Sequence, residues 1–380
     1  MPLLEGQKVL LISPQPWDHI HLSKHHYAME LARQGNEVFF LGPPDDTVDE
    51  GIRVEAAADT PGLKILRYRL GIPPAVRIHM RPMFDLLLRR TISNIREATG
   101  PVDVVWCFDF NLFADLGVFG AGLNIFHPVD RVSQQAHVDI GRSADAIFSV
   151  SELILSSFAD IDVPRFFINH GLSDAFARAA SQSPDNSVRK SGPPRIGYAG
   201  NLTRPPLNRA VLRRMVTEAA DAEFHFWGPY QISEGDEIES AAESREFVRF
   251  LQHAPNVILH GPVASDVLAA GMRDIDCFVL SYSLHSTESD RSNSHKILEY
   301  LSTGKVVVSS RISSYAGRED LLRMPAGDDD SELPGLLRDT LSRLDEFNAP
   351  PLRRVRQAFA LDNTYPKQVD RIRQALQSLT

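Results

Sequence analysis

A lysine and a glutamate one helical turn apart mark the most informative stretch of the chain. Residues 292–310 read SNSHKILEYLSTGKVVVSS, a polar start followed by an amphipathic segment and a valine-rich strand. Residues 292–294 predict a cap for a helix that starts near His295, where free N–H groups and the helix dipole favour an anion. Lys296 adds a full positive charge, and Glu299 on the same face can accept both hydroxyls of a ribose. The stretch therefore fits a nucleoside diphosphate, and the alternative is an ordinary capped helix with a surface ion pair.

A second group of candidate residues follows a short apolar segment in the first half, NIFHPVDRVSQ. Asp130 and His127 come after a predicted strand, so they lie at its carboxyl end, where a general base could take a proton from a hydroxyl. The alternative for Asp130 is a cap for a helix that begins at Arg131. Asp18 and His19 form a rival pair after the first predicted strand, with capping or a loop contact as their alternative.

Two further clusters raise the question of a metal. His21, His25 and His26 have helical spacing and are residue types that bind zinc. We interpret them as a solvated helix face. Residues 328–330 read DDD, and we interpret them as a solvated turn. The sequence therefore predicts no metal site.

The elements that must position these residues alternate between strands and helices. In the first half a helical pattern covers residues 20–34, and Gly35 ends it. Short apolar runs predict buried strands at residues 8–13, 37–41, 102–108, 124–126, 146–150 and 165–168. This alternation predicts an α/β fold with parallel sheets covered on both faces.

A polar segment with three prolines, residues 179–194, divides the chain and predicts a linker. A second series of strands is expected at residues 195–199, 223–227, 257–260, 277–280 and 306–309. We expect two Rossmann-like, doubly wound domains that face a cleft, with ligand at the carboxyl ends of the strands. The expected domains are residues 1–178 on the acceptor side and 195–362 on the donor side, with residues 363–380 as a helix that packs back on the first domain.

Several segments together resemble a known family. HKILEYLSTGKVVVSS resembles the donor-site signature of bacterial nucleotide-sugar-dependent glycosyltransferases of the GT-B fold, of the family 1 and family 4 type. In the same order as in that family, the chain also carries PQPWDHIHLSKHHYAMELARQGNEVFFLGPP, ADAIFSVSELI, FFINHGLSDAF, RIGYAGNL and NTYPKQVDRIRQAL. The resemblance implies transfer of a sugar from a nucleoside-diphosphate sugar to an acceptor hydroxyl, in exopolysaccharide, lipopolysaccharide or related glycan biosynthesis. It implies neither a metal nor another cofactor.

The resemblance also implies a set of donor-binding residues. In this numbering they are Gly200, Asn201, Arg204, Gly228, Tyr282, Ser292, Asn293, Ser294, His295, Lys296 and Glu299. The sequence departs from the family pattern at Arg291, where many retaining members carry a second glutamate. Asn201 and Pro206 replace the usual basic pair, so Arg204 or Arg209 would have to supply the charge. These departures leave retention or inversion of configuration open.

Composition limits the partners. The formal charge is −9 over 380 residues, which argues against a general nucleic-acid binder. Cys107 and Cys277 lie in apolar runs and are expected to be buried. No signal peptide or membrane span is recognisable, so we expect a cytoplasmic protein. Residues 64–90 are basic and apolar, which suggests contact with anionic lipid at the inner face of the membrane and a glycan or lipid-linked acceptor; the alternative is a helical hairpin with solvated arginines.

Two other functions fit the same fold. One is a nucleotide-binding protein that has lost catalysis, which the arginine at position 291 favours. The other is an epimerase of a free nucleotide sugar. The sequence does not identify the base, the sugar, the acceptor or the oligomeric state.

Overall fold

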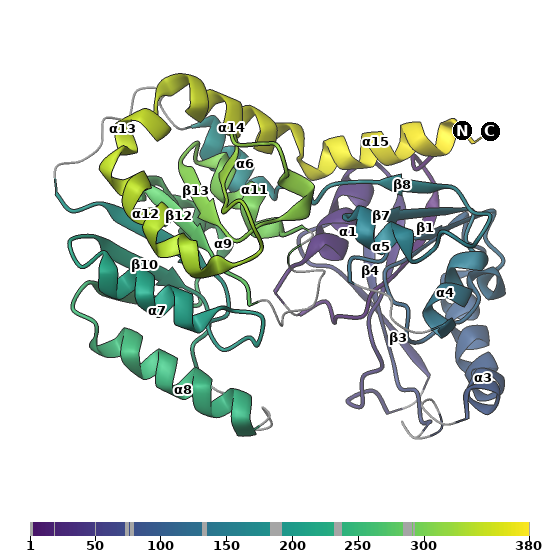
Figure 1. Cartoon of the computed structure of the whole chain (residues 1–380). Helices are drawn as coiled ribbons and strands as arrows, with labels where there is room; N and C mark the ends of the chain where they lie inside the picture. Colours follow the sequence, from purple (N-terminus) through teal and green to yellow (C-terminus); the bar gives the residue numbers. More distant parts are fainter. Residues whose placement is uncertain are drawn as a thin grey trace. The chain divides into compact units, whose positions relative to one another are not determined.

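The computed structural model describes residues 3–18, 20–49, 51–72, 76, 80–130, 135–182, 192–231, 238–283, 291 and 293–379 (Figure 1). The chain divides into two compact units. The first unit comprises Met1–Asn169 and Tyr365–Thr380, and the second comprises His170–Thr364. The sequence-based boundary at residue 178 differs from this division, because helix α6 (Asp174–Ser181) belongs to the second unit.

An eight-stranded sheet forms the centre of the first unit, in the order β3-β4-β2-β1-β5-β6-β7-β8. All neighbouring strands are parallel except β3 and β4. The register aligns Ile12, Cys107 and Phe126, so the carboxyl ends of β1, β5 and β6 lie side by side. The strands are β1 (Lys8–Ile12), β2 (Glu37–Leu41), β3 (Ile52–Ala56), β4 (Leu63–Tyr68), β5 (Val104–Cys107), β6 (Leu123–Phe126), β7 (Ala146–Ser149) and β8 (Arg165–Phe167).

Helices cover both faces of this sheet. On one face, α15 (Tyr365–Gln377) packs beside α1 (Ser23–Arg33), and both contribute to a core with Val9, Leu11 and Trp106. Apolar side chains of α3 belong to the other core cluster. The helices of that cluster are α3 (Arg81–Thr99), α4 (Gln135–Arg142) and α5 (Glu152–Ser156).

The second unit has a six-stranded parallel sheet in the order β11-β10-β9-β12-β13-β14. The strands are β9 (Arg195–Ala199), β10 (Glu223–Trp227), β11 (Val257–Gly261), β12 (Cys277–Leu280), β13 (Val306–Ser309) and β14 (Leu322–Arg323). Its main helices are α6, α7 (Arg209–Glu218), α8 (Ile238–His253), α9 (Ser265–Gly271), α11 (His295–Ser302), α12 (Leu333–Ser342) and α14 (Pro350–Asp362). The strand order reverses between β9 and β12, which is the switch point where ligands bind in such sheets.

Parts of the first unit differ from the sequence prediction. The helix expected over residues 20–34 begins at Ser23. The helical hairpin considered for residues 64–90 is wrong, because Leu63–Tyr68 forms β4, which pairs with both β2 and β3. Four of the six residues of β4 are buried, and Lys64 and Arg67 are half-buried. Among the described arginines of this segment, Arg67 lies on β4, whereas Arg81, Arg89 and Arg90 lie on α3.

Two other expectations concern burial and the membrane. Cys107 and Cys277 are buried and free, as predicted. Within the part of the chain that the structure describes, no helix is both long enough and apolar enough to cross a bilayer.

Candidate functional site

The first turn of α11 lies at the carboxyl edge of the second sheet. Tyr300, two residues beyond the middle of this helix, ties it to the end of β9: its hydroxyl accepts the Ala199 N–H at 2.8 Å and donates to the Ala199 carbonyl at 3.3 Å. Ile297, Leu298 and Leu301 are fully buried and fix the opposite face of the helix in the core. The helix start is therefore held rigidly beside the loops that follow the strands.

Lys296 projects from this first turn between two tyrosines. Its ammonium nitrogen lies 5.3 Å from the centre of the Tyr198 ring and 5.7 Å from that of Tyr282. Burial would lower the pKa of Lys296, but the Tyr198 and Tyr282 hydroxyls outweigh it and keep that pKa above its usual range. The side chain is thus a permanent cation at the amino end of a helix. The ammonium charge and the positive end of the helix dipole both attract an anion there.

Glu299 lies one turn further along α11 and is partly buried. Burial raises the pKa of this carboxyl to about 7, and the nearby Lys296 charge opposes the rise. No hydrogen bond to this carboxylate is found among the described residues. A partly desolvated acceptor without a partner is suited to receive hydroxyl protons from a ligand.

Two glycines allow the loops to approach the helix start. A side chain at Gly228, whose φ is +124°, would overlap the Gly200 carbonyl. A Cβ atom at Gly200, whose φ is +156°, would come within 2.6 Å of the Lys296 ammonium. Both positions therefore require glycine, because only glycine permits this backbone and this close approach.

The loop after β9 carries Arg204 and leads to Arg209, and the structure shows which of these two arginines is available to a ligand. Arg204 is exposed, has no ion pair among the described residues, and is close enough to Lys296 to lower its pKa. Arg209 is committed to the loop itself: one guanidinium nitrogen donates to the carbonyls of Thr203 (2.8 Å) and Arg204 (3.0 Å) and to the Ser244 hydroxyl (2.8 Å). Asn201 closes the same loop by accepting two hydrogen bonds from Thr203. Arg204 is consequently the arginine available to a ligand.

The residues before α11 differ from the expected cap. Ser294 is at the N-cap position with extended backbone, but its hydroxyl bonds the Tyr282 hydroxyl at 2.9 Å instead of a helix N–H. Side-chain capping by Ser294 is therefore wrong, and the Ile297 N–H donates instead to the Ser294 backbone carbonyl at 3.1 Å. Asn293 is buried, and His295 is exposed with its ring 6.0 Å from that of His170. Ser292 lies outside the described residues.

Arg291 is bound inside the second unit. It forms an ion pair of 2.8 Å with Asp330, which is 2% exposed, and it donates to the Tyr282 and Asp328 carbonyls. The Ser310 hydroxyl donates to the same carboxylate oxygen at 2.8 Å. The reading of residues 328–330 as a solvated turn is thus wrong for Asp330. The residue at position 291, where the resemblance led us to look for a second glutamate, is thus an arginine paired inside its own unit.

In the first unit, the structure separates the two residues proposed near β6. His127 is fully buried; its Nδ1 accepts from the Trp106 indole at 3.3 Å and its ring stacks on Phe108 at 4.7 Å. We assign His127 to the core, because an acceptor cannot reach it there. Asp130 is exposed four residues beyond β6. The helix that it was considered to cap would lie over residues outside the described part.

The rival residues after β1 have structural roles or lie outside the description. Asp18 is exposed and forms an ion pair with Arg67, which also binds Asp45 and Glu55. His19 is outside the described residues. Arg67, one of the arginines of the basic segment 64–90, is therefore already paired with carboxylates of the first unit.

The histidines of α1 are not a uniformly solvated face. His25 is fully buried; its Nδ1 accepts the Leu22 N–H and its Nε2 bonds the Pro16 carbonyl at 3.0 Å. Burial lowers the pKa of His25 to about 4, so the ring is neutral. Both nitrogens are used, which leaves no lone pair for a metal, and the described residues contain no group of three metal-type ligands.

The sequence analysis missed two residues at the same edge of the first sheet. Lys24, in the first turn of α1, is only 2% exposed, and Asp109, two residues after β5, is 6% exposed. Burial lowers the pKa of Lys24 to about 8, while Asp130 and Asp109 both act to raise it. Asp109 could have been found by the rule that selected Asp130, because it too follows a buried strand.

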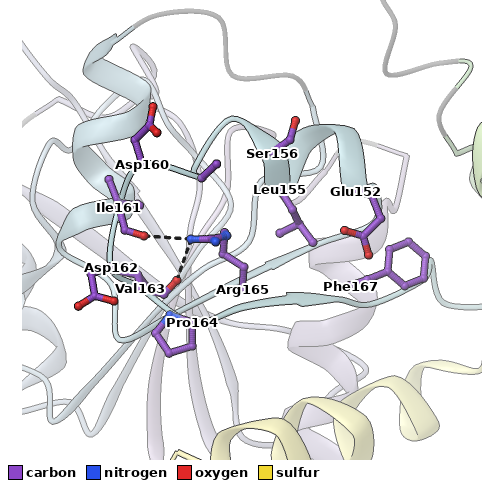
Figure 2. A pocket seen from close by; sticks show the side chains of 11 residues that line it. Glu152, Leu155, Ser156, Asp160, Ile161, Asp162, Val163, Pro164, Arg165 and Phe167 are labelled. Carbon is purple, nitrogen blue, oxygen red and sulfur yellow. Dashed lines mark hydrogen bonds between the residues drawn. The ribbon is translucent and has the colours of Figure 1, made fainter.

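A separate hollow of about 740 Å³ lies between α5 and β8 (Figure 2). Its central cation is already used: the Arg165 guanidinium donates to the carbonyls of Phe158, Ile161 and Val163 at 2.9–3.3 Å. Glu152, Asp160 and Asp162 line the rest of it. None of the residues selected for chemistry lies there, so we assign it no function.

Comparison with known proteins supports the geometry of the second unit. Residues 193–336 match a family model described as Glycosyl transferases group 1. The stretch includes all the donor-site residues described above, from Gly200 to Glu299. No curated protein matches the chain in sequence.

Solved structures resemble the whole chain in fold. An α,α-trehalose 6-phosphate synthase from Burkholderia multivorans is 13% identical with a TM-score of 0.71, covering 98% of this chain and 99% of that one. A sucrose-phosphate synthase from Thermosynechococcus elongatus is 14% identical with a TM-score of 0.66 and coverages of 98% and 100%. Anabaena Alr3699/HepE, solved in complex with UDP and glucose, is 13% identical with a TM-score of 0.65 and the same coverages.

These matches confirm the predicted resemblance to glycosyltransferases with two Rossmann-like domains, the GT-B fold. At such low identity the structural likeness shows the fold alone. The match to the family model lies within the second unit.

Proposed function

We propose that the chain is a glycosyltransferase that transfers a sugar from a nucleoside-diphosphate sugar to an acceptor hydroxyl. The observation that carries the proposal is the first turn of α11, which places a partly buried ammonium and an unpartnered carboxylate one turn apart. In this assignment Lys296, Arg204 and the N–H groups at the start of α11 bind the pyrophosphate. Glu299 accepts the ribose hydroxyls, and Asp130 is the candidate base.

The charge of the site supports a metal-free mechanism as part of the same proposal. A departing nucleoside diphosphate develops negative charge, and preorganised cations and helix N–H groups stabilise such charge. Lys296 and Arg204 supply two positive charges without any metal ligand. UDP is the first nucleotide to test, because a protein of similar fold was solved with UDP and glucose.

A thermal-shift screen with UDP, GDP, ADP and dTDP tests donor binding, because a ligand that binds the native state raises its melting temperature. We expect one diphosphate to raise it in the wild type and to lose most of the effect in Lys296→Ala. If none of the four raises it, donor binding is rejected. Turnover then separates the candidates: a transferase releases nucleoside diphosphate faster with an acceptor, an epimerase changes the sugar without net release, and an inactive protein binds only.

We further propose a cytoplasmic enzyme that works at the inner face of the membrane on a glycan or lipid-linked acceptor. The support is α3 and the residue before it. The side chains of Met80, Met83, Leu86 and Leu87 are 45–58% exposed. Arg89 and Arg90 follow, both exposed and without an ion pair among the described residues. An exposed apolar face beside unpaired arginines is suited to the surface of an anionic bilayer.

Vesicle sedimentation at two salt concentrations tests this contact. Vesicles with anionic lipid should bind the protein at low salt and release it at high salt. Replacement of Arg89 and Arg90 by Gln should abolish binding, whereas Arg53→Gln, which changes an exposed arginine paired with Glu55, should not. Equal binding to neutral vesicles, or full binding by the double variant, contradicts the proposal.

A further inference from the structure

The backbone of Tyr282 is held on both sides by groups that share one buried carboxylate. Tyr282 lies two residues after β12 and is 5% exposed. Its N–H donates to the Ser310 hydroxyl at 2.8 Å, and its carbonyl accepts from the Arg291 guanidinium. Ser310 and Arg291 both donate in turn to Oδ2 of Asp330, each at 2.8 Å. The four residues therefore close a hydrogen-bonded ring through the two backbone polar groups of Tyr282.

The ion pair in this ring is not a device for stability alone. Asp330 is 2% exposed and the side chain of Arg291 is 13% exposed, so both charges have lost most of their water. Arg291 Nε and Asp330 Oδ1 are buried and have no hydrogen-bond partner among the described residues. A buried ion pair with unsatisfied atoms gains little net free energy, because desolvation of the charges offsets their attraction. The residue that the pair orients explains it better.

The side chain of Tyr282 reaches the start of α11. Its hydroxyl bonds the hydroxyl of Ser294, the N-cap residue of this helix, at 2.9 Å. Its ring centre lies 5.7 Å from the Lys296 ammonium, and the tyrosine acts to raise the pKa of Lys296. A shift of the Tyr282 backbone would therefore change both the N-cap of α11 and the surroundings of Lys296.

We propose that Arg291, Asp330 and Ser310 are positioning residues that hold Tyr282, and through it Lys296, for the pyrophosphate of a nucleoside diphosphate. This inference rests on the proposed function, in which Lys296 binds that pyrophosphate. It gives Arg291 a task in ligand binding at the position where the resemblance led us to look for a glutamate. The task is indirect, because the guanidinium is bound to Asp330 and to backbone carbonyls of its own unit.

A double-mutant cycle on the full chain tests whether Arg291 acts through Lys296. Calorimetric titration measures UDP and uridine, and we expect Arg291→Met to weaken UDP about tenfold and uridine less than about twofold, because uridine lacks the phosphates. In the Lys296→Ala background the same change should have almost no further effect on UDP, because the group through which it acts is gone. A role in fold stability alone would give equal losses in both backgrounds.

Arg323→Met is the matched control. The Arg323 side chain is 17% exposed and forms a 2.8 Å ion pair with Asp339 in the same unit. It lies on β14, at the edge of the sheet. Its loss should lower the melting temperature without a selective loss of UDP over uridine.

Ser310→Ala is the second variant in case Arg291→Met does not fold. It keeps the ion pair but opens the ring at the Tyr282 N–H, so it should also weaken UDP more than uridine. The proposal is overturned if the folded variants bind UDP like the wild type, lose UDP and uridine equally, or lose as much UDP affinity in Lys296→Ala as in the wild type. These outcomes leave the donor site itself standing. Absence of UDP binding by the wild type would instead reject the donor site, and this inference with it.

Discussion

Two lysines, each the second residue of a helix that starts at the carboxyl edge of a sheet, show what surroundings do to the same side chain. Lys296 in α11 lies between two tyrosine rings and keeps a pKa above its usual range. Lys24 in α1 has two carboxylates nearby, yet burial lowers its pKa to about 8. Tyrosine hydroxyls and ring faces thus compensate a buried ammonium in one unit, whereas distant carboxylates only partly do so in the other.

The difference assigns different tasks to the two edges. A permanent cation at the amino end of a helix suits a charged pyrophosphate. A cation with two carboxylates suits hydroxyl groups that donate and accept. The predictions below test this division, from the largest expected effect to the smallest.

Asp130→Asn should separate chemistry from donor binding. Removing a general base costs about 10²- to 10⁴-fold in rate, so turnover should fall in that range while UDP affinity and melting temperature stay unchanged. Asn caps a helix about as well as Asp, so a capping role predicts near-normal turnover. Steady-state rates with donor and acceptor decide between the two roles, and near-normal turnover removes Asp130 as the base.

Lys296→Ala should weaken UDP more than uridine. A hydrogen bond to a charged group contributes about 1.5–3 kcal/mol, or roughly 10- to 150-fold in affinity. Calorimetric titration of both ligands measures the difference, with uridine as the internal control because it lacks phosphates. Equal losses for the two ligands show that Lys296 only supports the fold.

Arg204→Ala and Arg209→Ala form a matched pair on one loop. Arg204 is exposed and unpaired among the described residues, so its loss should weaken UDP several-fold without a change in melting temperature. Arg209 binds two carbonyls and a hydroxyl of its own unit, so its loss should lower the melting temperature first. If Arg209→Ala is as stable as the wild type and Arg204→Ala binds UDP normally, the ligand-binding role of Arg204 and the structural role of Arg209 are both contradicted.

Glu299 predicts a pH dependence. Its folded pKa of about 7 exceeds its ordinary value of 4.5, so the native state holds more protons than the unfolded state between these values. The free energy of unfolding should therefore fall as pH rises from 4.5 to 7, and Glu299→Gln should lack this component. UDP-glucose affinity should rise through pH 7 in the wild type and stay flat in the variant. Parallel pH curves for the two proteins would show that Glu299 does not titrate there.

Much of this division was predictable from the sequence, but unequally. In the second unit, strands β9, β10, β12 and β13 fall where apolar runs of four or five residues stand between turn residues, and both charges of the site lie on one short helix. Local spacing therefore specified the proposed donor site. Arg204 and Arg209 could not be distinguished, because the role of Arg209 depends on a contact with Ser244, which is distant in the sequence.

In the first unit the site depends on tertiary structure. Lys24 comes from the first turn of α1, and Asp109 and Asp130 follow β5 and β6. The proximity of these segments follows only from the strand order β1-β5-β6. The burial of His127 and His25 depends on aromatic neighbours from distant segments, so both appeared available in the sequence. Strand β4 was missed because Lys64 and Arg67 made it resemble part of a basic surface segment.

Hydrogen exchange with and without UDP tests the central claim most directly, because it locates the binding site along the chain. The account predicts that UDP slows exchange in the first turn of α11, in the loop from Gly200 to Arg204 and around Gly228. Any change that UDP causes at Lys24 or Asp109 should disappear in Lys296→Ala. Protection confined to the first unit, or the same protection in Lys296→Ala as in the wild type, would contradict a diphosphate site at the start of α11.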